Sequence, residues 1–137
     1  MAVYKIYPQQ DATIYSQYPS MNTGIDEIIE ASTIPSQYNI LTTLPQASRF
    51  LLQFSQDEML SISSSLIAGT TAFSASLRCY AANITGLSQT TILQILTVSG
   101  SWNNGTGKYG DTPTTTNGVS WLYRSSDATN PWTTSRS

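Results

Sequence analysis

The sequence predicts an all-β protein: an antiparallel β-sandwich of the jelly-roll kind with one short helix. First, the polarity comes from 20 serines and 19 threonines, while only 10% of the 137 residues are charged. Threonine, tyrosine and other β-branched or aromatic residues favour strands. Second, short alternating segments separated by turn residues follow one another in hairpin succession. Third, the one helical pattern stands among these strands without βαβ repetition, which favours an antiparallel architecture.

The N-terminal part predicts two short strands. Residues 3–7 (VYKIY) alternate between apolar and polar side chains and stop at Pro8, and residues 12–16 (ATIYS) follow after a turn. Residues 25–32 (IDEIIEAS) fit either a helical face or a short strand. Loop composition with two prolines returns over 33–47.

The middle of the chain predicts the clearest strand and the helix. Residues 48–55 (SRFLLQFS) alternate, so that Phe50, Leu52 and Phe54 would share one face. Ser55 then fits the N-cap of a helix over 56–67 (QDEMLSISSSLI), because acidic residues in its first turn favour the helix dipole. Gly69 is expected to end that helix.

The C-terminal half predicts three further strands. Residues 73–84 (FSASLRCYAANI) alternate strongly, which would bury Cys79 as a small apolar side chain. Residues 90–98 (TTILQILTV) follow after a turn, and residues 118–124 (GVSWLYR) form the last expected strand. These elements make one domain over residues 1–137.

Charge and composition exclude several function classes. The net charge is −2 and the six basic residues are scattered, which argues against nucleic-acid binding through phosphate contacts. The N-terminus has no apolar run of a signal peptide, and no segment approaches the roughly 20 apolar residues of a membrane span. The single cysteine allows no internal disulfide.

One stretch, SWNNGTGKYGDTP over 101–113, resembles a dinucleotide-binding turn, because its glycines at 105, 107 and 110 spell G-x-G-x-x-G. That motif needs a helix at its third glycine to hold the pyrophosphate. The residues that follow include Pro113 and a threonine run, which are poor helix formers. We therefore interpret the stretch as a glycine-rich loop with Lys108 and Tyr109 at its tip.

Catalytic and metal sites find little support in the sequence, and no cofactor is expected. The chain has no histidine, which removes Ser-His, Cys-His and most zinc arrangements. Three loop carboxylates, Asp11, Asp111 and Asp127, could converge as a glycosidase pair or bind calcium, but turn-forming aspartate is the more frequent role. We expect a protein that is not an enzyme.

Aromatic residues in or beside loops are the remaining binding candidates. Such rings stack on sugars and also anchor protein interfaces. Trp102 and Trp121 are interpreted first as core residues at the end of the sandwich. The residues expected to contact a partner protein or a glycan are Lys108, Tyr109, Trp121, Tyr123 and Trp132.

Several strings, in order, resemble the DNRLRE-type domain: DATIYS, SRFLLQFS, SASLRCYAANI, TILQILTVSGSW and GVSW, over most of residues 11–121. That family is similar to carbohydrate-binding β-sandwich modules, and the resemblance places Trp102 and Trp121 at either end of the glycine-rich loop. Modules of this family normally continue beyond the GVSW strand with further strands. Either the sequence is a shortened version of a longer protein that lacks the C-terminal strands of the family module, or a sheet edge is left open. We expect that edge to be covered by another subunit.

More narrowly, MAVYKIYPQQDATIYS, PSMNTGIDEIIEAS and SGSWNNGTGKYGDTPTTTNGVSWLY resemble virion structural proteins of T4-like marine cyanophages. The resemblance implies a non-enzymatic component of a tail, neck or fibre that packs against other virion proteins after assembly in the host cytoplasm. The alternative is a carbohydrate-binding module that contacts host surface glycans. A polysaccharide-degrading enzyme is a third hypothesis and requires the acids named above to face one groove.

Overall fold

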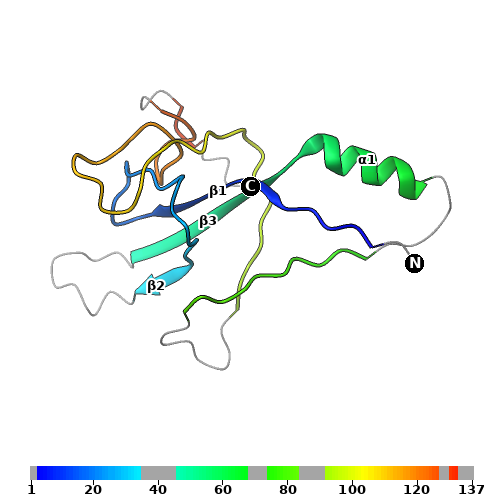
Figure 1. Cartoon of the computed structure of the whole chain (residues 1–137). Coiled ribbons are helices and arrows are strands. Elements are labelled where there is room, and N and C mark those ends of the chain that lie inside the picture. Colours follow the sequence, from blue (N-terminus) through cyan, green and yellow to red (C-terminus); the bar gives the residue numbers. More distant parts are fainter. Residues whose placement is uncertain (1–2, 35–45, 68–73, 84–91, 127–129, 133–137) are drawn as a thin grey trace.

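The computed structural model describes residues 3–34, 46–67, 74–83, 92–126 and 130–132, and its centre is one small antiparallel sheet. The elements are β1 (Pro8–Tyr15), β2 (Ser32–Ile34), β3 (Gln46–Phe54) and α1 (Gln56–Ile67). Strand β3 lies in the middle, in the order β1-β3-β2, and both neighbours pair with it antiparallel. Figure 1 shows this sheet with the C-terminal loops gathered over β1 and with α1 projecting away.

Strand β1 begins at Pro8 and pairs with β3 along its whole length. Thr13 lies opposite Phe50 and Tyr15 opposite Ser48, with a register shift near Pro8 at the start of the strand. Pro8 is tolerated because β1 is an edge strand and proline lacks the N–H group that a central strand would need. The predicted strand over 48–55 is confirmed as β3. The strand expected over 12–16 is confirmed in its position but begins at Pro8, so the turn expected before it, at residues 9–11, is wrong.

A side chain closes part of the free edge of β1. The buried Thr23 hydroxyl accepts a hydrogen bond from the Thr13 N–H group at 3.2 Å and donates one to the Thr13 carbonyl at 2.6 Å. One hydroxyl thus takes the place of a neighbouring strand for both backbone groups of that residue. Without it these buried groups would lack partners, which is costly.

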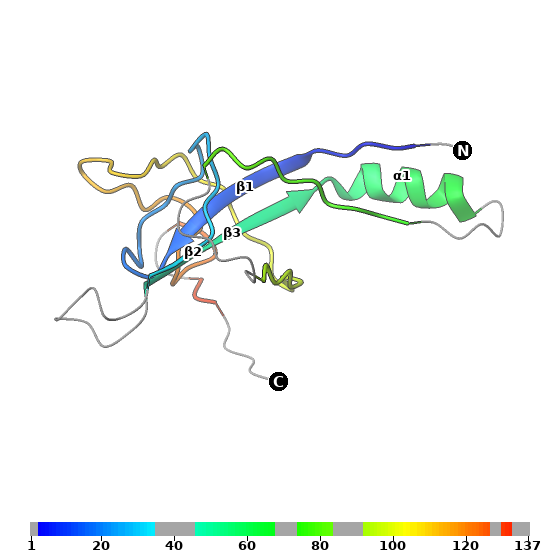
Figure 2. The ribbon, with the colours of Figure 1, turned by 90° about the horizontal axis from the view of Figure 1, so that it is seen from below.

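Helix α1 has the bounds that the sequence predicts. The Ser55 side chain accepts a hydrogen bond from the Glu58 N–H group, and the Ser55 carbonyl accepts one from Met59, so Ser55 is the N-cap. Figure 2 shows the helix beside the N-terminal segment and outside the sheet. Met59 and Leu60 are accordingly more than half exposed. The expected end at Gly69 lies outside the described residues.

The core is small and lies between the sheet and irregular loops. Ala12 and Ile14 of β1 share a face and pack with Val119, which is fully buried. Leu51 lies opposite Ala12 in the register and joins this cluster. The remaining partly buried members are the three tryptophans, Trp102, Trp121 and Trp132.

The predicted β-sandwich is wrong. The described residues form a single open three-stranded sheet, and segments 3–7, 74–83, 92–99 and 118–122 contain no strand. Near the last expected strand there is only an isolated bridge between Tyr123 and Pro131. Alternation favours an extended backbone, but a strand also needs a pairing partner, and that partner comes from distant sequence. Loops, rather than a second sheet, cover the core.

One further expectation falls with the sandwich. Cys79 is exposed rather than buried, because the extended segment that carries it packs against no second sheet. The expected shared face of Phe50, Leu52 and Phe54 is confirmed in β3, and these side chains are half-buried, whereas Leu51 on the other face meets the core. In the described part of the chain, no helix is long and apolar enough to cross a membrane.

Candidate functional site: a tyrosine-lined groove beside the glycine-rich loop

The glycine-rich loop is held by side-chain oxygens that accept hydrogen bonds from its backbone. Five consecutive N–H groups, from residue 105 to residue 109, each donate to a side chain at 2.8–3.2 Å. The acceptors, in order along the loop, are Asn103, Asn117, Asn22, Asp111 and Asp26. These amides are therefore already satisfied within the protein.

Asn22 is the central residue of this arrangement and is fully buried. Its Oδ1 atom accepts a hydrogen bond from the Gly107 N–H group at 2.8 Å. Its Nδ2 group donates to the carbonyls of Asn104 at 2.7 Å and Val119 at 2.9 Å. One amide side chain thus joins the loop after β1 to both ends of the glycine-rich loop.

The geometry does not suit a pyrophosphate. No helix begins at Gly110, and residues 111–118 are irregular, so the loop prediction is confirmed. The amides that a phosphate would need donate to carboxylate and amide oxygens instead. Gly105 has φ = 76° and packs against Asn22 and Gly118, so it is needed for a left-handed turn in a tight space.

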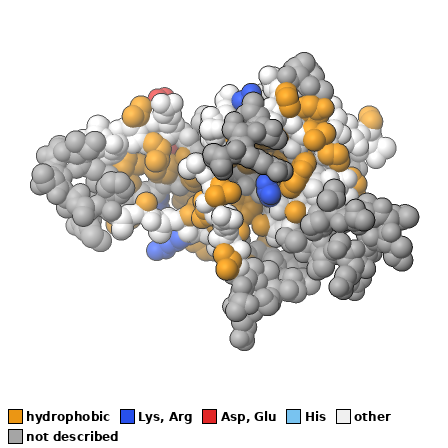
Figure 3. Space-filling model, turned by 180° about the vertical axis from the view of Figure 1, so that it is seen from behind, with side chains coloured by type: hydrophobic (Ala, Val, Ile, Leu, Met, Phe, Trp, Pro, Cys, Tyr) orange, Lys and Arg blue, Asp and Glu red, His pale blue; other side chains and the backbone are white. Residues whose placement is uncertain are grey.

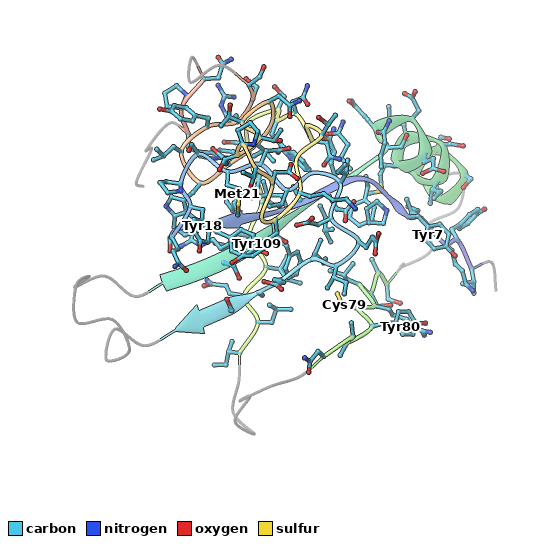
Figure 4. The ribbon with its side chains drawn as sticks, turned by 60° about the vertical axis from the view of Figure 1, so that its left-hand side comes forward. Tyr7, Tyr18, Met21, Cys79, Tyr80 and Tyr109 are labelled. Atoms are coloured by element: carbon cyan, nitrogen blue, oxygen red, sulfur yellow. The ribbon has the colours of Figure 1, made fainter. Side chains whose placement is uncertain are left out.

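Three tyrosines gather where this loop meets the end of β1. The Tyr109 ring lies 5.2 Å from that of Tyr15 and 5.8 Å from that of Tyr18, tilted in one case and edge-on in the other. These are favourable aromatic geometries. Tyr18 and Tyr109 lie together in Figure 4, on the side of the sheet where the loops gather. Asp26 orients Tyr109, because both of its carboxylate oxygens accept from the Tyr109 N–H group.

A groove of about 510 Å³ opens beside these tyrosines. Its lining contains three acidic side chains, Asp26, Glu27 and Glu30, and one basic side chain, Lys108. Lys108 and Glu27 form an exposed ion pair at 3.8 Å, a kind that contributes little stability. The other lining residues are Tyr15, Gln17, Ile28, Ser32, Ala47, Ser48 and Tyr109.

Three ionisable groups in or near the groove, Tyr15, Tyr109 and Asp111, have shifted pKa values. Burial and then a 2.9 Å hydrogen bond to Glu30 raise the pKa of the Tyr15 hydroxyl far above its ordinary value. The neighbouring Tyr18 side chain is the main cause of a raised pKa at Tyr109. Hydrogen bonds from the Lys108 backbone and from Thr115 lower the pKa of Asp111. Tyr15 is therefore neutral over the whole physiological range.

The structure brings together only two of the residues that the sequence predicts at a contact site. Lys108 and Tyr109 both line the groove. Trp121 and Trp132 pack against the core, where Trp121 lies under Arg49 at 5.0 Å and Trp132 donates to the Ser120 carbonyl. Trp102 also packs against the core. Tyr123 lies in the bridge to Pro131, away from the groove lining.

The acids considered for catalysis do not form a pair in the groove. Asp11 lies in β1 and is absent from the groove lining, and Asp127 lies outside the described residues. The Asp111 carboxylate accepts bonds from Lys108 and Thr115 within its own loop. Among the described residues, no group of three or more acidic or cysteine side chains could hold a metal ion.

Sequence reasoning missed most of the residues that shape this site. Asn22 looked like an ordinary turn residue within QYPSMNTG, and Asp26 and Glu30 belonged to a segment with two possible structures. Tyr15 and Tyr18 lie in or beside loops of the sequence and are not among the residues expected to contact a partner. Asn22 and Asp26 are distinguished by contacts with residues 82–97 positions away, which a local pattern does not contain.

Comparison with known proteins finds no matching protein family, no similar curated protein and no similar solved structure. The resemblance to the DNRLRE-type domain therefore stays a prediction that rests on its quoted strings. The assembly role proposed below rests on the described residues, and its assignment to a phage particle rests on the resemblance to virion structural proteins.

Proposed function

We propose that the protein is a non-enzymatic structural component of a phage particle, a subunit that packs against other particle proteins. One observation carries the proposal: the described chain leaves long extended apolar segments without a covering layer. Residues 74–83 and 92–99 are extended and exposed, and no hydrogen bond joins residues 74–82 or 92–99 to the rest of the described chain. Subunits of large assemblies complete their folds with neighbours in this way.

These exposed segments carry a free-energy cost that only a partner relieves. Their large side chains are strongly exposed: Tyr80 to 92% and Ile92 to 89%. Transfer out of water is worth about 1.5–3 kcal/mol for each fully buried large side chain. A particle-bound subunit gains this free energy on assembly. The charge-poor surface fits the same role, because few charged groups would have to be desolvated.

The test is the composition of purified particles. Particles of the virus that encodes the chain are separated from host protein by density and analysed by mass spectrometry. We expect peptides of this chain in fixed proportion to those of the known particle proteins. Their absence from particles, with the protein abundant in the infected-cell lysate, would refute the proposal.

The groove supports a second candidate, the binding of a glycan. Tyrosine rings and carboxylates are the groups that bind sugars, by stacking on apolar ring faces and by accepting hydroxyl hydrogen bonds. Tyr109, Glu27 and Glu30 bring both kinds into one groove of about 510 Å³.

A glycan array of host-surface and related polysaccharides tests this candidate. We expect binding that falls at least tenfold in Tyr109→Ala and that stays unchanged in Tyr80→Ala, since Tyr80 is exposed and lies apart from the groove (Figure 4). Binding that is absent, or equal in both variants, would exclude a glycan site here.

A further inference from the structure

The most apolar exposed segment of the described chain is residues 92–98, with sequence ILQILTV. Five of its seven side chains are large and aliphatic, and each exposes between 48% and 89% of its surface. They are Ile92, Leu93, Ile95, Leu96 and Val98. Figure 1 shows the segment crossing the direction of the strands rather than running alongside them, and Figure 3 shows apolar side chains reaching the surface on the face seen there.

This pattern is that of a strand buried on both faces. In an extended chain, residues 92, 94, 96 and 98 face one side and residues 93, 95 and 97 face the other. Apolar side chains occur on both sides, as in strands covered by two layers. The segment therefore needs a pairing partner for its backbone and apolar cover for its side chains.

We infer that the occupant is a second copy of this chain, whose own residues 92–98 pair with this segment antiparallel about a two-fold axis at Ile95. This inference rests on the proposed assembly role and names its partner. In a symmetric antiparallel pair, the residue on the axis lies opposite itself. Centring on Ile95 uses the whole segment and places Ile92 opposite Val98.

The absence of charged side chains and the exposed apolar area of residues 92–98 both support a second copy of the chain as the partner. Residues 92–99 contain no ionisable side chain, so two copies can approach without like-charge repulsion. At roughly 60–120 Å² of apolar surface for each large side chain, the five leave a few hundred Å² uncovered, as much as the largest patches of ordinary monomers. This apolar area is about half of the surface that one partner buries in a standard interface, and the paired backbones add further buried surface.

The first experiment is the oligomeric state of the full chain by analytical ultracentrifugation at tens of micromolar. We expect a wild-type dimer and a monomer for Ile95→Asp, because the two-fold axis would place two carboxylates opposite each other. Ile25→Asp is the matched control, since Ile25 is 47% exposed elsewhere on the surface, and it should stay dimeric. A monomeric wild-type protein, or a dimeric Ile95→Asp variant, would overturn the inference.

The second experiment tests the register and does not depend on how well a charged variant folds. In a Cys79→Ser background, Ile95→Cys places two thiols across the axis at about 4.5–5.5 Å between Cβ atoms, close to disulfide geometry. Ile92→Cys is the matched control, because its two copies would lie roughly 20 Å apart along the strands.

With oxidised glutathione, we expect Ile95→Cys to form covalent dimers at least tenfold faster than Ile92→Cys. Equal rates would overturn the pairing. If the chain is present in particles but monomeric in solution with equal crosslinking, this inference fails while the proposed particle role stands. Absence from particles together with specific Ile95 crosslinking would refute the particle role and support the pairing.

Discussion

The Oδ1 atom of Asn22 accepts a hydrogen bond from the Gly107 amide at 2.8 Å, across 85 positions of sequence. The same side chain donates to two carbonyls that flank the glycine-rich loop. Because Asn22 is fully buried, each of these groups depends on it for a partner. The shape of the groove follows from this contact, since it holds Tyr109 beside Tyr15.

Asn22→Ala should therefore destabilise the fold more than an ordinary surface change. The substitution removes the partner of two carbonyls and of the N–H groups of Gly24 and Gly107, so we expect a loss of about 3 kcal/mol. Asn117→Ala is the matched control, because its bonds to Thr106 are exposed, and it should cost less than about 1 kcal/mol. Urea unfolding of both variants measures the difference, and equal losses would contradict the role of Asn22.

Alanine substitutions at Gly105 and Gly110 distinguish the free-energy cost of backbone strain from the cost of close packing. Both have positive φ, 76° and 82°, but a Cβ atom at Gly105 would collide with Asn22 and Gly118, while Gly110 has open space. Gly110→Ala should cost about 1 kcal/mol, from the left-handed conformation alone. Gly105→Ala should cost at least twice as much in the same unfolding assay. The reverse order would show that the loop is looser than its hydrogen bonds indicate.

Thr23→Val tests the closure of the β1 edge. Valine keeps the shape of threonine but leaves the buried N–H and C=O groups of Thr13 without a partner, which we expect to cost about 2 kcal/mol. Hydrogen exchange gives a second measurement, because the Thr13 amide should lose protection while the neighbouring Asn22 amide, which donates to the Thr115 carbonyl, keeps its own. Unchanged exchange at Thr13 would mean that another group protects this edge.

The raised pKa of Tyr15 predicts that the folded protein loses stability in alkaline solution. Its pKa is raised in the folded state by burial and by the bond to Glu30, whereas the unfolded chain titrates near the ordinary tyrosine value of 10.0. The stabilisation is therefore fully present below pH 10 and decreases as the pH rises above it, because only the unfolded state loses the proton easily. Tyr15→Phe should weaken this alkaline decrease.

The measurement is the unfolding midpoint from about pH 8 to about pH 11.5, together with the tyrosinate absorbance of the folded protein. Part of the absorbance of the eight tyrosines should appear late in the wild type, and this part should be smaller in Tyr15→Phe. The urea-unfolded protein is the control and should show no late part. An identical late part in Tyr15→Phe would assign it to another residue.

Much of the local structure was predictable from the sequence. The alternation of SRFLLQFS predicted the centre of β3, and Ser55 followed by Asp57 and Glu58 predicted the start of α1. The glycine-rich stretch was predicted as a loop because Pro113 and the threonines oppose a helix. These predictions succeed because they depend on neighbouring residues, through strand periodicity, helix capping and turn preference.

The sandwich prediction failed where distant partners decide the structure. Residues 74–83 and 92–99 have the composition of strands, yet neither pairs within the described chain. Alternation specifies which side chains share a face, but it does not specify what covers that face. The same limit applies to the tryptophans, because only the folded chain places Trp121 and Trp132 in the core and Tyr109 at the groove.

The sequence by itself determined the short-range features of this protein: where β3, α1 and the second half of β1 form, and that residues 101–113 are a loop. Only the tertiary structure decided that Thr23 closes an edge strand and that Asn22 binds the loop near Gly107. The physical reason is that a hydrogen bond between distant residues depends on the path of the whole chain, whereas periodicity and capping act within a few residues.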